Sequence, residues 1–229
     1  MSMMSADCIN TMSEQGRNAT PLPLIEAVHE IFGGTRSLDN PGIELDLASD
    51  RVINQDVLAK RFYGINHDSF SLSWAAKTVW LNPPGTTVRG GHYDERLYWL
   101  GEMKKPKREQ GPKPHDVSVV KAAEWYFWLF HYWQLGHIEN AIALVYRGGS
   151  LGSVGCDFLN SADICLTAKG AKSPIVSGSG RISFELITDE ETRSPQTSNT
   201  QSSVILGLFR DHEMRQRFRR KMTDFGAVK

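Results

Sequence analysis

Cysteine is scarce in this chain, and the residue spacings that mark metal sites are missing. The 229 residues include three cysteines, Cys8, Cys156 and Cys165, and no two of them form a Cys-x-x-Cys pair. The seven histidines are scattered, without a His-x-x-x-His pair. An odd number of thiols without metal-ligand spacing fits a reducing cytoplasm and does not suggest a metal site.

The chain also lacks a long apolar run and an excess of either charge. No stretch approaches the length that crosses a membrane, and the N-terminus has no signal-peptide core. We therefore expect a cytoplasmic protein without a membrane partner. The 26 basic and 26 acidic side chains balance, so a nucleic-acid surface would require local segregation of charge. The length suits one α/β domain with a full core.

Basic residues gather in two segments of the sequence. The first segment contains Arg96, Lys104, Lys105, Lys107, Arg108 and Lys113 against two glutamates. The second contains Arg210, Arg215, Arg217, Arg219, Arg220 and Lys221 against two acidic residues. Each segment has two interpretations, a DNA contact or a solvated surface, and for the second the two weigh equally.

The periodicity of apolar residues predicts alternating strands and helices. It favours helices over 24–32, 117–135, 154–159 and 212–221, a short helix or irregular segment over 53–62, and strands over 43–47, 79–81, 138–146 and 162–167. Segments 182–187 and 204–209 suggest a closing antiparallel pair. We predict an α/β domain with a Rossmann-like, mostly parallel sheet and a closing antiparallel hairpin. It spans 20–209 with a basic loop insertion at 85–116, between a disordered N-terminus (1–19) and a basic tail (210–229).

The segment Val-Trp-Leu-Asn-Pro-Pro-Gly at 79–85 indicates a buried strand with an abrupt end. Neither Pro83 nor Pro84 can donate a hydrogen bond to a neighbouring strand, so pairing stops there. In open α/β sheets, ligands bind at the carboxyl ends of strands. The sequence therefore predicts that Asn82 projects its amide into a binding crevice.

This arrangement suits alkylation of an exocyclic amine. The Asn82 side-chain oxygen and the Pro83 carbonyl can accept both amine hydrogens and direct the nitrogen lone pair at a methyl donor. Such catalysis consists of positioning and electrostatic stabilisation, and requires no general base with a shifted pKa. Read from the Asn-Pro-Pro letters alone, a strand followed by a polyproline turn is an equally good interpretation.

The order of short motifs in this sequence resembles the phage-type DNA N6-adenine methyltransferases. Members of that family carry Thr-Pro near the start of the domain, Asp-Pro-Ala/Cys-Ser, an Asn, an Asp shortly before a Trp, and Val-Trp-Leu-Asn-Pro-Pro. The matching residues here are Thr20-Pro21, Asp46-Leu47-Ala48-Ser49, Asn54, Asp68 with Trp74, and 79–84. The strand at 181–184 and the loop after it also look like the end of the family's domain, so the resemblance covers residues 19–209.

The resemblance implies an S-adenosyl-L-methionine-dependent enzyme of phage or prophage type that acts on DNA. On this reading the cofactor site contains Thr20, Pro21, Asp46, Ala48, Ser49, Asn54 and Asp68, and the catalytic residues are Asn82, Pro83, Pro84 and Gly85. No Gly-x-Gly-x-x-Gly is present, so composition alone would not identify this cofactor. Without the resemblance, Asp46 reads as a turn or cap carboxylate and Asp68 as a turn cap.

Two positions depart from the family pattern. Leu47 stands where the family usually has Pro, and Gly85 stands where it usually has an aromatic residue that stacks on the flipped base. The loop that follows could replace that aromatic and supply phosphate contacts. The substrate-binding candidates are Arg89, Tyr93, Tyr98, Trp99, Lys104, Lys105, Lys107 and Arg108. The other interpretation of this loop is a mobile surface insertion.

Two further functions remain open from the sequence. Asn-Pro-Pro sites also methylate glutamine amides in proteins, and a methyltransferase fold that has lost activity could bind DNA or cofactor only. Gly85 and Leu47 keep the inactive alternative open, whereas the basic loop favours a nucleic-acid substrate.

Overall fold

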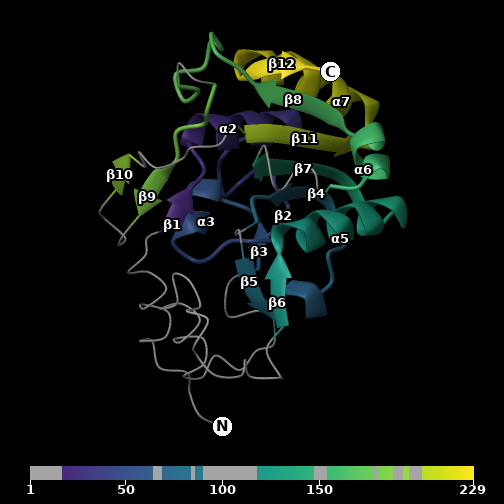
Figure 1. The fold of residues 1–229 in the computed structure, drawn as a ribbon. Helices are drawn as coiled ribbons and strands as arrows, with labels where there is room; N and C mark the ends of the chain where they lie inside the picture. The colour runs from purple at the N-terminus through teal and green to yellow at the C-terminus, as the bar shows by residue number, and fades with distance from the viewer. Residues whose placement is uncertain are drawn as a thin grey trace, which may run out of the picture.

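A seven-stranded sheet forms the centre of the protein in the computed structural model, which describes residues 17–63, 69–83, 86–89, 118–146, 154–177, 180–187, 193–195 and 203–229. Figure 1 shows the strands stacked from the top of the view downward. In spatial order they are β12 (Gly226–Val228), β8 (Asp163–Thr167), β11 (Ser203–Phe209), β7 (Ile138–Tyr146), β4 (Ala76–Leu81), β2 (Leu45–Asp46) and β3 (Arg61–Phe62).

The first four strands along the chain within this sheet run in one direction. β3, β2, β4 and β7 form parallel pairs with their neighbours. β11 lies antiparallel between β7 and β8, and β12 lies antiparallel to β8 at the edge. The prediction of an α/β fold with a sheet that is parallel at its start is confirmed, and this arrangement is consistent with a Rossmann-like fold.

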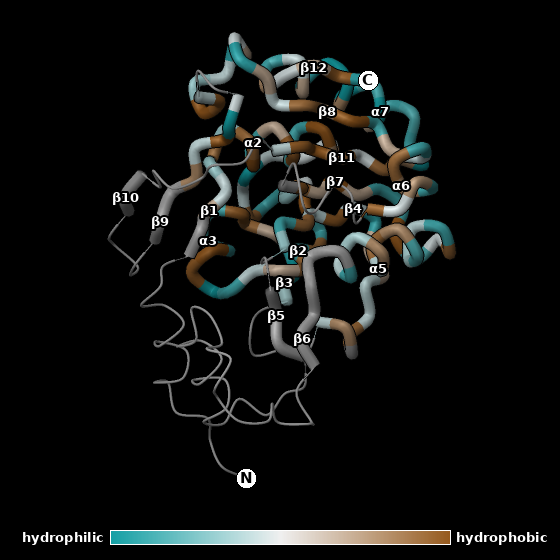
Figure 2. The backbone as a smooth tube through the Cα atoms, viewed as in Figure 1, coloured by the Kyte–Doolittle hydropathy of each residue, from teal (hydrophilic) through white to brown (hydrophobic). Residues whose placement is uncertain are grey.

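Helices cover both faces of the sheet. Buried residues of α2 (Leu22–Ile31), α3 (Ile53–Val57) and α7 (His212–Lys221) pack on one face, and those of α5 (Ala122–Gln134) and α6 (Cys156–Ser161) pack on the other. β4 serves both cores, since Trp80 faces the first set of helices while Val79 and Leu81 face the second. A sheet covered on both faces requires continuous apolar strands, and the central strands in Figure 2 are largely hydrophobic.

Smaller elements complete the fold. β1 (Arg17–Ala19), β9 (Glu185–Ile187) and β10 (Arg193–Pro195) form a separate antiparallel sheet in the order β1-β9-β10. β5 (Thr86–Arg89) and β6 (Ser118–Lys121) form a two-stranded antiparallel ribbon. The 3₁₀ turns are η1 (Ser69–Ser71) and η3 (Met222–Asp224).

The predicted closing pair of 182–187 with 204–209 is wrong. Segment 203–209 forms β11, whose neighbours are β7 and β8, while segment 185–187 forms β9 in the small sheet. β11 is buried over six of its seven residues, so it suits a central position between two other strands. β9 has three residues and pairs with two short strands instead.

Both terminal segments of the chain contain secondary structure that pairs with the rest of the fold. The prediction of a disordered segment over 1–19 lies largely outside the described residues, but residues 17–19 form β1, which is held by its pairing with β9. The basic tail over 210–229 is part of the domain. It forms α7, as the helical pattern predicted, and β12, which pairs with β8.

The predicted basic loop insertion of 85–116 begins and ends in paired strands. Thr86–Arg89 pairs with Ser118–Lys121, so the chain returns to the point where it left the sheet. The predicted helix over 117–135 begins at Ala122, after β6. Within the parts of the chain that the structure describes, none of the helices combines the length and apolar character that crossing a membrane requires.

Candidate functional site

The order in which the chain builds the sheet places a topological switch point between β2 and β4. From β2 the chain adds β3 on one side, then returns to place β4 on the other side of β2 and β7 beyond it. β2 and β4 therefore lie at a topological switch point, where the connections diverge in opposite directions. Ligands of open α/β sheets bind outside the carboxyl ends of the strands at such a point.

The register of β2 and β4 brings two predicted site residues to this switch point. Leu45 pairs with Val79 and Asp46 pairs with Trp80. Asp46 is the last residue of β2, and Asn82 follows the last residue of β4. The carboxylate and the amide therefore belong to the same edge of the sheet at adjacent strand ends.

Leu47, one departure from the family pattern, continues the pairing of these strands. Its backbone N–H donates to the carbonyl of Trp80 over 3.2 Å, and its side chain is fully buried. A proline at this position could not make that bond, because it has no backbone N–H. The leucine thus extends the contact between β2 and β4 by one hydrogen bond.

Asn82 makes a side-chain contact with the N-terminal part of the chain. Its Nδ2 donates a hydrogen bond of 3.0 Å to Oγ1 of Thr20, which is 6% exposed. Thr20 precedes Pro21, the N-cap residue of α2, and both prolines near the contact, Pro21 and Pro83, are buried. The structure therefore brings the predicted catalytic amide onto a residue predicted to be part of the cofactor site.

The other polar atom of the Asn82 amide has no partner. Its Oδ1 is buried, and within the described part of the chain it accepts no hydrogen bond. Buried polar atoms are nearly always hydrogen-bonded in folded proteins, and leaving one without a partner costs about 1–3 kcal/mol. An acceptor of this kind at a switch point fits a ligand that donates an N–H.

Asp46 is a buried carboxylate at the end of β2. It is 1% exposed, and its Oδ1 accepts the backbone N–H of Ala48 over 3.1 Å. Burial raises the pKa of Asp46 to about 7, and the like charge of Asp50 acts in the same direction. The hydrogen bonds from Ala48 and from the Ser49 side chain favour the charged form but do not offset burial.

The segment after Asp46 is fixed by further hydrogen bonds. The backbone N–H of Ser49 donates to the carbonyl of Tyr63 over 2.9 Å, which joins the ends of β2 and β3. Asn54 uses its amide locally, since Oδ1 accepts the N–H of Ala59 over 3.0 Å and Nδ2 donates to the carbonyl of the same residue over 3.3 Å. Asn54 therefore shapes the turn after α3, a role that motif spacing does not reveal.

Several predicted site residues lie outside the described residues. Arg89 ends β5, although its side chain is not described. The remaining positions outside the description are Asp68, Pro84, Gly85, Tyr93, Tyr98, Trp99, Lys104, Lys105, Lys107 and Arg108. Their assignments stay predictions from the sequence.

The aromatic residues of α5 are mainly core residues. Trp125 and Tyr126 are buried, and Trp74 stacks on Trp125 with ring centroids 5.8 Å apart. Trp80 is also buried, at 1% exposure, as expected from its strand position. The helix is not buried all round, since Phe127 is 63% exposed.

The basic side chains of α7 are largely bound within the fold. Asp163, at 3% side-chain exposure, receives Arg215 at 2.6 Å and Arg219 at 2.6 Å. Lys221 pairs with Glu30 of α2. These ion pairs tie α7 to the sheet and to α2, which favours a structural role for this segment over a phosphate-binding one.

His29 of α2 is a core residue and does not lie on the helix surface. The side chain is fully buried, its Nε2 donates to the Val57 carbonyl over 2.7 Å, and its Nδ1 accepts the N–H of Gly42 over 2.9 Å. Burial lowers the pKa of His29. The sequence contains an indication of this burial, because His29 falls on the apolar helix stripe formed with Ile25 and Phe32.

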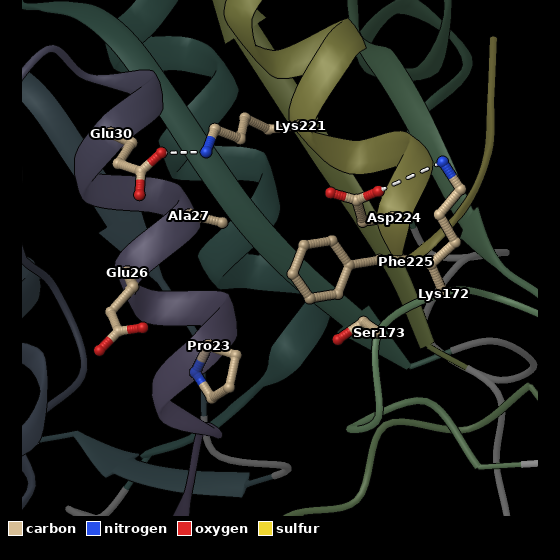
Figure 3. A pocket seen from close by; sticks show the side chains of 9 residues that line it. All are labelled: Pro23, Glu26, Ala27, Glu30, Lys172, Ser173, Lys221, Asp224 and Phe225. Atoms are coloured by element: carbon tan, nitrogen blue, oxygen red, sulfur yellow. Dashed lines mark ion pairs between the residues drawn. The ribbon is translucent and has the colours of Figure 1, made fainter.

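A cavity of about 400 Å³ lies between α2 and the segment around η3, and its lining includes neither β2 nor β4 (Figure 3). Two ion pairs form at the rim of the cavity, one between Lys221 and Glu30 and one between Lys172 and Asp224 at 3.9 Å. Phe225 lies among these charged groups. Because four of its five charged side chains pair with one another, the cavity offers less to a ligand than the switch point does.

The described residues contain no cluster of three or more histidine, cysteine or acidic side chains that could hold a metal ion. In comparisons with known proteins, no family model, curated protein or solved structure matches the chain. What the protein does is therefore inferred from the site itself.

Proposed function

We propose that this protein is an S-adenosylmethionine-dependent DNA methyltransferase that methylates the N6 amine of adenine. The observation that carries the proposal is the buried, partnerless Oδ1 of Asn82 at the carboxyl end of β4, beside the switch point. An acceptor in this place suits a substrate that brings an N–H donor. The motif order from Thr20 to Pro84, which resembles the phage-type family, specifies adenine in DNA.

The chemistry follows from two acceptors at one strand end. The amine nitrogen of adenine is a poor nucleophile, because its lone pair is delocalised into the ring. Asn82 Oδ1 and the Pro83 carbonyl would each accept one amine hydrogen, which draws the nitrogen toward tetrahedral geometry and localises its lone pair on the side of the methyl donor. The nitrogen would form its bond to the methyl carbon as the carbon–sulfur bond of the donor breaks and the sulfur keeps that electron pair, and the nitrogen would release one proton to solvent. The two residues contribute by orientation and electrostatic stabilisation.

The carboxylate at the end of β2 has the charge that suits a positively charged cofactor. S-Adenosylmethionine supplies an electrophilic methyl group on a positively charged sulfur and also carries an ammonium group. Asp46 is a buried carboxylate whose charge is disfavoured by burial and by Asp50. A cationic ligand would offset both effects. We expect Asp46, Ala48 and Ser49 to hold the cofactor, together with Thr20-Pro21 and Asp68 as the resemblance implies.

DNA is supported as the substrate by the position of the basic loop. β5 begins three residues after Pro83, so the ribbon of β5 and β6 carries the ends of the segment rich in lysine and arginine. Phosphate contacts from such a segment would hold DNA near the strand end. The target adenine would leave the base stack to reach Asn82, at a cost of a few kcal/mol.

Methyl incorporation tests this function against its two rivals. The purified protein is incubated with labelled S-adenosylmethionine and with DNA, a protein extract or no substrate. Label in DNA that digests to N6-methyladenine is the expected result. Label in protein alone would indicate a glutamine methyltransferase, and cofactor binding without label in either substrate would indicate an inactive binding protein.

A further inference from the structure

The Thr20 hydroxyl lies in a segment that is held on both sides. Ala19, the residue before it, ends β1 and pairs with Glu185 of β9. The carbonyl of Pro21, the residue after it, accepts the N–H groups of Leu24 over 3.0 Å and Ile25 over 3.3 Å at the start of α2. A strand and a helix therefore fix the backbone around Thr20, and its hydroxyl is presented from a rigid support.

The contact of this hydroxyl with Asn82 fixes the position of the amide at the end of β4. A threonine hydroxyl both donates and accepts, so it can bind either atom of a side-chain amide, and in this structure it accepts from Nδ2. With Nδ2 bound to Thr20 Oγ1 at 3.0 Å, the acceptor Oδ1 is left without a partner. Accepting an amine hydrogen requires this orientation, since the opposite one would present N–H groups to the amine.

We propose that Thr20 is a positioning residue for methyl transfer, which anchors the Asn82 amide at the strand end so that its oxygen can face the target amine. This inference rests on the proposed function of the site. It gives Thr20 a role in the transfer step, whereas the family resemblance gives it a role in binding the cofactor. The two roles predict different kinetic effects, because only the second requires a change in cofactor affinity.

Three variants test the role by kinetics. Thr20→Val keeps the shape of the side chain and removes the hydroxyl, and Thr20→Ser keeps the hydroxyl. Thr78→Val is the matched control, since Thr78 is a buried threonine of β4 whose hydroxyl donates to the Gly42 carbonyl over 2.7 Å, at the other end of the strand. Each variant is assayed for methyl transfer to DNA and for S-adenosylmethionine affinity by calorimetry.

Thr20→Val is expected to lower kcat about tenfold, the worth of one hydrogen bond, while cofactor affinity stays within about twofold. Thr20→Ser restores kcat to within about twofold, and Thr78→Val lowers thermal stability without changing kcat. Parent kcat in Thr20→Val, a loss confined to cofactor affinity, or an equal loss in Thr20→Ser would each overturn the proposal.

A second measurement does not depend on activity. The Nδ2 hydrogens of Asn82 are identified by NMR as the side-chain amide signals that disappear in Asn82→Ala, and their exchange with solvent is followed. Thr20→Val is expected to speed this exchange about tenfold or more, whereas Thr78→Val leaves it unchanged. Unchanged exchange in Thr20→Val would overturn the positioning role. If the parent transfers no methyl group, the proposed function fails, and the exchange rates still decide whether Thr20 holds the amide.

Discussion

Asp46 lies directly opposite Trp80 in the parallel pairing of β2 and β4. The pairing ends within two residues of this point on each strand, after the Leu47 N–H bonds to the Trp80 carbonyl. A carboxylate and an amide that are 36 positions apart in the sequence thus belong to adjacent strand ends. The candidate site depends on this register, because a shift by one residue would turn each side chain to the opposite face of the sheet.

The raised pKa of Asp46 makes the stability of the protein depend on pH. Its pKa rises from 3.8 to about 7 through burial, so the folded protein binds more protons than the unfolded chain between these values. The associated stability is present below pH 3.8 and is lost as the pH rises through 7. Asp46→Asn should therefore raise the free energy of unfolding at pH 8 by about 2 kcal/mol and change it little at pH 4, as measured by urea denaturation.

A second buried aspartate provides the control for this experiment. Asp163 binds both Arg215 and Arg219 at 2.6 Å, so Asp163→Asn should lower the free energy of unfolding at pH 8, by about 2 kcal/mol. Opposite signs for the two substitutions would support the assignment. A loss of stability at pH 8 in Asp46→Asn would show that its carboxylate is not disfavoured by its surroundings.

Binding of S-adenosylmethionine should release a proton near neutral pH. The cation favours the charged form of Asp46, whose pKa is about 7 without it, so affinity should fall below pH 7 and approach a tenfold loss per pH unit. Calorimetry in buffers of different ionisation enthalpy measures the protons released. Asp46→Asn should bind more weakly at pH 8 and release no proton; equal release from this variant would assign the proton to another group.

His29 should make the protein less stable in mild acid. The folded pKa lies below the ordinary 6.5, chiefly because the ring is buried, so the unfolded chain takes up a proton first as the pH falls. The contribution of His29 to the free energy of unfolding should decrease as the pH drops from 6.5 toward 5, opposite in sign to the contribution of Asp46 over the same range. His29→Gln should flatten this dependence and cost about 1–3 kcal/mol at pH 8, because the bonds to Val57 and Gly42 are weakened. The exposed His212 supplies a control: His212→Gln should keep the parent slope, and an unchanged slope in His29→Gln would contradict the account.

DNA affinity should fall steeply with salt through the basic loop. Replacing Lys104, Lys105, Lys107 and Arg108 with alanine should lower the logarithmic salt slope by about 0.9 for each DNA phosphate that the protein no longer neutralises. A control that exchanges lysine and arginine at these four positions keeps the charge and should keep the slope. If the alanine variant binds DNA with the parent slope, the phosphate-binding residues lie elsewhere in the chain.

Much of the central sheet could be predicted from apolar patterns. The strand over 138–146 has the predicted bounds, because its apolar run over 141–145 is buried in a two-sided core. The position of β11 between β7 and β8 could not be predicted in the same way. Antiparallel partners are chosen by long-range packing, and neighbouring segments 182–187 and 204–209 offered a more local pairing that the fold does not use.

The site was predictable in part. The strand-end position pointed to Asn82, the resemblance added Asp46, and the register places the two at adjacent strand ends. The bond between Thr20 and Asn82 spans 62 positions, and no periodicity reports such a contact. The basic tail could not be interpreted from its charges alone. A count of charged residues does not reveal that Asp163 binds Arg215 and Arg219.

The most direct test of the account is methyl transfer by the Asn82→Ala variant. The parent protein and the variant are given the same DNA and labelled cofactor, and cofactor affinity is measured for both. We predict that the parent forms N6-methyladenine, and that the variant binds S-adenosylmethionine as the parent does but transfers the methyl group about a hundredfold more slowly or worse. Turnover at the parent rate in Asn82→Ala, or a parent that forms no N6-methyladenine, would contradict the central claim.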